Sequence, residues 1–143
     1  MIFLVHPPTQ EGIRMIKGIN AGCGFPGVSM GAVAGEGSLM FLSGHVGTDE
    51  AGEPVAGGLE AQARAAFENM GKTLAAAGVG FEALAKMTTY ITDPSPESLA
   101  AFKKVRNSFV NMDCPPANAL VTVAGLYDPA IKIEIEGVAV IPR

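Results

Sequence analysis

The segment Lys86–Met112, KMTTYITDPSPESLAAFKKVRNSFVNM, decides the fold because its pattern changes from strand to helix within one run. The β-branched and aromatic residues around Tyr90 favour a strand. Ser95 is suited to cap a following helix, and Pro96 fits the first turn of that helix. The segment therefore predicts a strand, a sharp stop and an amphipathic helix, whose apolar stripe is Leu99, Phe102, Val105, Phe109 and Met112.

A second amphipathic helix is predicted upstream, over Leu59–Ala77, where apolar residues recur every three or four positions. Gly78 can adopt the left-handed conformation that ends such a helix. The apolar stripe of this helix consists of Ala63, Ala66, Phe67, Met70, Leu74 and Ala77.

Short apolar runs outside the two helices predict four further strands. Val28–Ala34 and Leu39–Ser43 are joined by a glycine-rich link, which favours a hairpin. Asn118–Ala124 and Ile131–Ile141 follow the second helix, and the last of these alternates between isoleucine and charged residues. The predicted order of elements is therefore ββαβαββ.

This order describes one α+β domain over residues 27–143, preceded by an irregular arm over residues 1–26 that is rich in glycine and proline. Two helices cannot cover both faces of the predicted sheet, so we expect them side by side on one face. On the other face of the last strand, charged residues give way to Val138 and Val140. This mixed surface predicts contact between copies of the chain.

Composition and charge argue against several classes of partner. A net charge of -4 on 143 residues gives no general attraction to nucleic acid. No apolar run approaches the roughly 20 residues of a membrane span, so no membrane is expected as a partner. Cys23 and Cys114 lack the spacing of a metal site and are expected to be free thiols, which fits a cytoplasmic location.

The last third of the chain carries a family resemblance. The string PANALVTVAGL at Pro116–Leu126, followed by IEI at 133–135, resembles the C-terminal signature of the RidA/YjgF family. Gly27–Val33, Leu42–Val46 and the run Asn69–Ala83 also resemble that family. The similarity therefore extends over nearly the whole chain apart from the arm.

The resemblance implies a chorismate-mutase-like fold and a homotrimer with a barrel-like core and three clefts between subunits. It also implies hydrolysis of a reactive imine or enamine to a carbonyl compound and ammonia, without a metal or organic cofactor. The endoribonuclease name that the family also carries is not expected to describe this chain. An acidic chain without a catalytic constellation for RNA is a poor candidate for that activity.

Four positions of the family's cleft can be assigned residue by residue. Glu134 matches the signature glutamate and would hold or activate the attacking water, although a plain strand carboxylate is the alternative. Asn118 stands where the family has an arginine facing the substrate carboxylate, and it could instead satisfy backbone groups of a turn. Ser29 replaces the tyrosine of the cleft, and Leu120 replaces a small sulfur-containing residue.

Two residues near the end of the second predicted strand are further candidates for substrate binding. The hydroxyl of Ser43 could contact a ligand in the cleft, or could be satisfied by its neighbours. His45 has a side chain suited to proton transfer near neutral pH, although a loop histidine usually faces solvent.

These substitutions leave two functions open. The first is a hydrolase for a small imine, enamine or related electrophile that lacks a carboxylate. The second is a trimer without catalytic activity, which binds a small metabolite in its clefts or a protein on its surface. The loss of the family arginine at Asn118 favours the second function, and the retained Glu134 favours the first.

Overall fold

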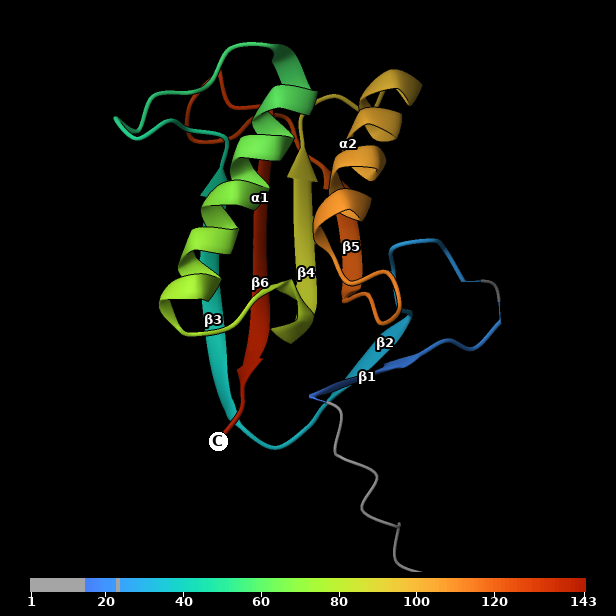
Figure 1. Cartoon of the computed structure of the whole chain (residues 1–143). Helices are drawn as coiled ribbons and strands as arrows, with labels where there is room; N and C mark the ends of the chain where they lie inside the picture. Colours follow the sequence, from blue (N-terminus) through green and yellow to red (C-terminus); the bar gives the residue numbers. More distant parts are fainter. Residues whose placement is uncertain (1–14, 23) are drawn as a thin grey trace, which may run out of the picture.

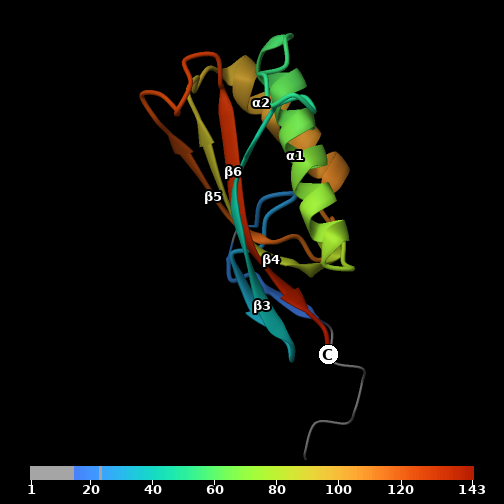
Figure 2. The ribbon, with the colours of Figure 1, turned by 90° about the vertical axis from the view of Figure 1, so that its left-hand side faces the viewer.

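The protein is described by a computed structural model over residues 15–22 and 24–143. Its elements are β1 Ile16–Ile19, β2 Gly31–Ala34, β3 Ser38–Val46, α1 Gly58–Ala76, a 3-10 turn Phe81–Ala83, β4 Leu84–Ile91, α2 Pro96–Phe109, β5 Ala117–Thr122 and β6 Ile133–Ile141. A four-stranded sheet has the order β3-β6-β4-β5, in which only β4 and β5 are parallel. Both helices cover one face of this sheet, as Figures 1 and 2 show. The predicted α+β domain is confirmed.

Helix α2 begins where the sequence predicts. The Ser95 hydroxyl accepts a hydrogen bond from the backbone N–H of Ser98 at 3.2 Å, and Pro96 is the first helical residue. The carboxylate of Asp93 accepts a second bond from the Ser98 hydroxyl at 2.6 Å. This bond, together with bonds from Ser95, lowers the pKa of Asp93 below its usual value. A charged Asp93 therefore stabilises the start of the helix.

The hydrophobic core lies between the helices and the sheet. Phe67 of α1 stacks on Phe109 of α2 with ring centroids 5.2 Å apart. Ile133 and Ile135 of β6 are fully buried on the same side, together with Met87 of β4. The predicted alternation of the last strand is therefore confirmed, with its isoleucines facing the helices. None of the helices in the described ranges is long and apolar enough to cross a membrane.

Two expectations about the N-terminal third are wrong. β2 does not form a hairpin with β3; it pairs with β1, while β3 pairs with β6. The expected irregular arm contains β1, because Ile16 is buried against Ala85 and Val140. A strand of four residues with a glycine inside is too short to be recognised by alternation alone. Residues 1–14 of the predicted arm, and Cys23, lie outside the described residues.

The sheet face opposite the helices, here called the open face, carries apolar and polar side chains together. Phe41 is 75% exposed and Val121 is 40% exposed. A hollow of about 270 Å³ on this face is lined by Phe41, Leu42, Lys86, Thr88, Glu136, Gly137 and Val138. The mixed character predicted for this face is present around Val138, whereas Val140 is fully buried against Ile16 of β1 and is not part of an exposed surface.

Candidate functional site

Glu134 projects from β6 onto the open face, where its carboxylate lies against the backbone of Gly44 in β3. A β-carbon added at Gly44 would overlap this carboxylate. Glu134 is half-buried and pairs across the sheet with Tyr90 of β4. The carboxylate predicted to handle water is thus held at a close backbone approach that glycine permits.

A β-bulge in β3 brings Gly44 to this position. Ser43 and Gly44 together occupy the space opposite the single residue Glu136. A bulge of two residues against one bends the strand and re-aims the side chains that follow. Ser43 is exposed and lies one residue from the contact between Gly44 and Glu134. The structure therefore brings together two of the predicted site residues, Ser43 and Glu134.

Tyr90 and Glu136 form a hydrogen-bonded pair beside Glu134. The phenol of Tyr90 donates to Oε1 of Glu136 at 3.0 Å. This bond raises the pKa of Tyr90, and burial and the charges of Glu136 and Glu134 raise it further. Alternation within the strand predicts the face that Tyr90 occupies, but it does not predict which residues of another strand share that face. Sequence reasoning therefore misses this pair.

His45 faces the helices, on the opposite side of the sheet from Glu134. Its Nε2 lies 2.7 Å from the hydroxyl of Thr73 in α1, and its Nδ1 lies 2.7 Å from the carbonyl oxygen of Ser43. Because a carbonyl oxygen only accepts, Nδ1 donates in the bond to Ser43. The hydroxyl of Thr73 also lies 3.3 Å from the carbonyl oxygen of Asn69. The bond to Thr73 joins β3 to α1, and the bond to Ser43 lies within β3. His45 is half-buried, and its side chain is on the other side of the sheet from that of Glu134.

Asn118 and Leu120 lie on β5, on the side of the sheet that faces the helices. Asn118 pairs with the fully buried Met87, and Leu120 pairs with the fully buried Thr89. The hydroxyl of Thr89 lies 3.5 Å from Oδ1 of Asn118, at the limit of a hydrogen bond. Leu120 remains 39% exposed. These two predicted site residues are therefore grouped with each other and separated from Glu134 by the sheet.

Ser29 lies beside the start of β5. Its backbone N–H donates to the carbonyl oxygen of Pro116 at 3.1 Å, and it forms a parallel bridge with Ala117. The residue is 1% exposed, and its hydroxyl has no hydrogen-bond partner among the described residues. A β-carbon added at Gly18 of β1 would approach that hydroxyl to 2.7 Å. Ser29 thus lies against the start of β5. Because it pairs with Ala117, its side chain is on the opposite face of the sheet from that of Asn118. Its hydroxyl lies beneath β1.

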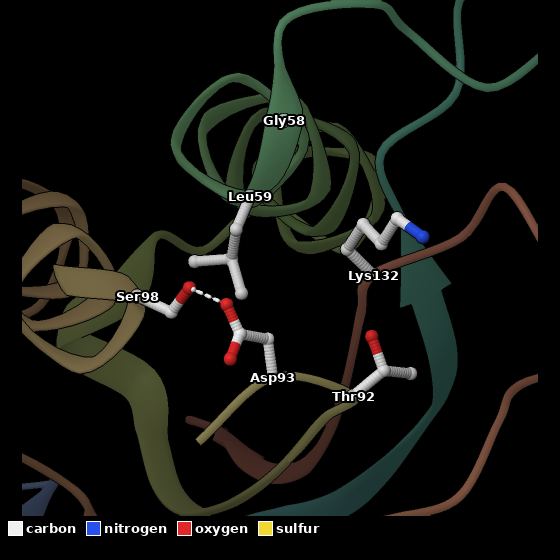
Figure 3. Close-up of a pocket in the computed structure, with 6 residues that line it drawn as sticks. All are labelled: Gly58, Leu59, Thr92, Asp93, Ser98 and Lys132. Carbon is white, nitrogen blue, oxygen red and sulfur yellow. Dashed lines mark hydrogen bonds between the residues drawn. The ribbon is translucent and has the colours of Figure 1, made fainter. Parts of the chain in front are cut away.

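A separate pocket of about 510 Å³ opens where both helices begin. Gly58, Leu59, Thr92, Asp93, Ser98 and Lys132 line it (Figure 3). Its carboxylate, Asp93, is bonded to Ser98, and the ammonium of Lys132 points away from Asp93 in Figure 3. None of the predicted site residues lines this pocket. The carboxylate of Asp93 stabilises the start of α2 through its bond to Ser98.

The side chains of the described residues show whether a metal site is formed among them. Across residues 15–22 and 24–143, no group of three or more His, Cys, Asp or Glu side chains is arranged to hold a metal ion. The polar groups of the candidate site are carboxylates, hydroxyls and an amide, and these can bind water and move protons.

Comparison with known proteins identifies the family to which this chain belongs. The sequence model described as Endoribonuclease L-PSP matches residues 29–141. RutC family protein YjgH of Escherichia coli (strain K12) is 34% identical over 107 residues, which are 75% of this chain and 79% of that protein. The human 2-iminobutanoate/2-iminopropanoate deaminase is 32% identical over 102 residues, which are 71% of this chain and 72% of that protein.

A solved structure of a relative agrees with this fold. YyfB from Yersinia pestis, a conserved Rid family protein of unknown function, superimposes with a TM-score of 0.82 at 29% identity. The match covers 88% of this chain and 98% of that chain. On the family match, the identities and the shared fold, this chain belongs to the RidA family, whose sequence model is described as Endoribonuclease L-PSP.

Proposed function

We propose that this protein hydrolyses a small imine, enamine or related reactive metabolite in a cleft between subunits of a homotrimer. The observation that carries the proposal is the carboxylate of Glu134, held against Gly44 beside Tyr90 and Glu136. Relatives named 2-iminobutanoate/2-iminopropanoate deaminase, which align over 71% of this chain, support the reaction type.

The reaction needs a group beside the imine carbon that accepts a proton and later donates it. The water oxygen bonds to the imine carbon as Glu134 takes a proton from the water and the imine nitrogen gains a proton from solvent. Glu134 then gives its proton to the nitrogen of the carbinolamine, the C–N bond breaks and ammonia leaves, and the hydroxyl releases its proton to solvent as it becomes the carbonyl. A single carboxylate can take the first proton and return it to the departing nitrogen.

The positions of the candidate residues on the sheet support a cleft between subunits. Glu134 lies on the open face, whereas Asn118 and Leu120 lie on the face toward the helices. A cleft between two copies of the chain could bring the two sets to one small ligand. Contact between copies would also cover the exposed Phe41 of the open face.

The substrate that we propose lacks a carboxylate. Asn118, Ser29 and Leu120 carry no charge, so these three positions offer no cation for an anionic substrate. The same observation favours the second function, a trimer that binds a small metabolite without converting it. The two functions differ in what Glu134 does, because only the hydrolase needs its carboxylate.

Two measurements test the proposal. Light scattering at micromolar concentration is expected to give three times the chain mass, and a monomer mass would contradict the homotrimer. Ammonia release is then followed from 2-iminobutanoate and from an imine of equal length without a carboxylate, with the buffer rate subtracted. Native protein should prefer the second imine, and Glu134→Gln should lose about a hundredfold in kcat. Equal rates for native protein, Glu134→Gln and buffer would leave the binding function.

A further inference from the structure

Arg106 is a buried cation in the C-terminal part of α2. The residue is only 5% exposed. Its Nη2 donates to the carbonyl oxygen of Pro26 at 2.7 Å, and its Nε donates to Oδ1 of Asn107 at 3.1 Å. Its guanidinium carbon lies 5.5 Å from the ring centroid of Phe102. All of these partners are neutral.

Arg106 has no carboxylate partner within the described ranges. The ion pairs there join Glu60 to Arg64 and to Lys104, both on exposed helix surface. A buried charge is normally paired, because the protein interior solvates it poorly. Burial accordingly lowers the pKa of the Arg106 guanidinium. Burial disfavours the charged form of Arg106, and no ion pair among the described residues offsets this cost. The presence of an arginine here must therefore be explained by another role.

The guanidinium of Arg106 packs against the turn Phe25–Val28, which directly precedes Ser29 in the chain. The backbone N–H of Val28 donates to the carbonyl oxygen of Phe25 at 3.1 Å, which closes the turn. Gly27 within it has a φ of +77°, and a β-carbon there would come within 2.8 Å of Nη2 of Arg106. The turn is thus packed tightly against the arginine at a position where the backbone itself favours glycine.

The chain leaves this turn directly into Ser29. Ser29 is fixed to the start of β5 by its bond to Pro116 and its bridge to Ala117, and Asn118 is the next residue of β5. A continuous set of contacts therefore runs from α2 through Arg106 and Gly27 to Ser29 and the start of β5.

We propose that Arg106 is a positioning residue of the cleft, which ties the Pro26–Ser29 turn to α2 and so holds this turn against the start of β5, the strand that carries Asn118. The role in catalysis rests on the proposed function, whereas the role in holding the turn does not. A fork of donors suits this task better than a single ammonium, because it reaches Pro26 and Asn107 at once.

The first test is structural and needs no substrate. Amide hydrogen exchange is measured at Val28 and Ser29 in native protein, Arg106→Met, Arg106→Lys and the control Lys103→Met, which removes an exposed charge from the same helix. Arg106→Met should speed exchange at these two amides about tenfold and leave the amides of β4 unchanged, and Arg106→Lys should fall between. Exchange in Arg106→Met equal to that in Lys103→Met would overturn the proposal. Should Arg106→Met fail to fold, Arg106→Lys is compared with the same control.

The second test separates positioning from simple loss of folded protein. With the imine that native protein hydrolyses, Arg106→Met should raise KM about tenfold and change kcat less than about twofold, because β5 carries Asn118, which in the proposed cleft binds substrate and does not handle water. A lower kcat at unchanged KM would mean only that less protein is folded, and would overturn the role in the cleft. If native protein hydrolyses no imine while the exchange result holds, the proposed function fails and the positioning of the turn stands.

Discussion

Glu134 and Asn118 lie on opposite faces of the same four-stranded sheet, because Glu134 pairs with Tyr90 and Asn118 pairs with the next-but-two residue of that strand, Met87. Residues an odd number of positions apart in a strand point to opposite sides. In the proposed cleft, therefore, Glu134 and Asn118 come from two different chains. Assemblies that mix variant and native chains can test this.

Mixed assemblies should reveal a shared cleft. Asn118→Arg is expected to raise hydrolysis of 2-iminobutanoate by at most about a hundredfold, since two charge-assisted hydrogen bonds to its carboxylate contribute about 3 kcal/mol. The double variant Asn118→Arg/Glu134→Gln should lose this gain alone but regain part of it when co-assembled with native chains. In such trimers one chain supplies the new cation and its neighbour supplies Glu134. Activity no higher than that of the unmixed proteins would contradict a cleft shared between chains.

Gly44→Ala should displace the carboxylate of Glu134, because the added methyl group occupies its place. We expect kcat for imine hydrolysis to fall at least about tenfold, while the free energy of unfolding changes by less than about 1 kcal/mol, since the end of a glutamate side chain can move aside. Gly125→Ala is the matched control, because no heavy atom lies within 4 Å of the added carbon. Unchanged kcat in Gly44→Ala would separate Glu134 from the reaction.

His45→Ala should affect stability rather than chemistry. The substitution removes the bonds to Thr73 and to the carbonyl oxygen of Ser43, so the free energy of unfolding should fall by about 2 kcal/mol. The kcat of the remaining folded protein should be unchanged within about twofold. Urea unfolding and activity measured on the same preparation give both quantities. A large loss of kcat without loss of stability would restore the predicted role of His45 in proton transfer.

Tyr90 should lose its proton above the ordinary tyrosine value of about 10, because its hydrogen bond to Glu136 favours the neutral phenol. The chain has two tyrosines, so Tyr127→Phe leaves Tyr90 as the only titrating phenol in an ultraviolet titration. Adding Glu136→Gln removes a negative charge and should lower the midpoint toward the ordinary value. A midpoint that stays the same would mean that the two side chains are not bonded in solution.

The cap formed by Asp93 should make stability depend on pH. The folded state lowers the pKa of Asp93, so its contribution is complete above the unfolded value of about 3.9 and is lost as pH falls through the lower folded value. The difference in free energy of unfolding between native protein and Asp93→Asn should therefore shrink across that interval. Chemical denaturation at a series of pH values measures it. A difference that grows with acidity would reverse the assigned direction of the pKa shift.

Local chemistry explains which parts of the fold could be predicted. Ser95, Pro96 and the alternation of the last strand act through neighbouring residues, and the structure agrees with the prediction at each. The partners of β2 and β3 could not be predicted, because pairing depends on tertiary packing such as the burial of Ile16 against Val140.

The same distinction between local pattern and tertiary packing applies to the candidate site. Glu134 could be placed on its face from alternation, and its likeness to the family signature suggested a role. His45 could not, because its orientation depends on the bulge, which exists only through the pairing of β3 with β6. The tie between Arg106 and Pro26 spans 80 positions of sequence and leaves no local pattern at either end.

The sheet topology also bears on the order of folding. β4, α2 and β5 are consecutive in the chain and adjacent in space, so they can assemble at a small cost in loop-closure entropy. β3 pairs with β6 across nearly the whole described chain, with Ser38 opposite Ile141, and this high contact order makes their pairing slow. We expect the sheet to close last at β3 and β6. The carboxylate of Glu134 meets Gly44 only in that step, so a partly folded chain would have its helices and most of its core before it had a site.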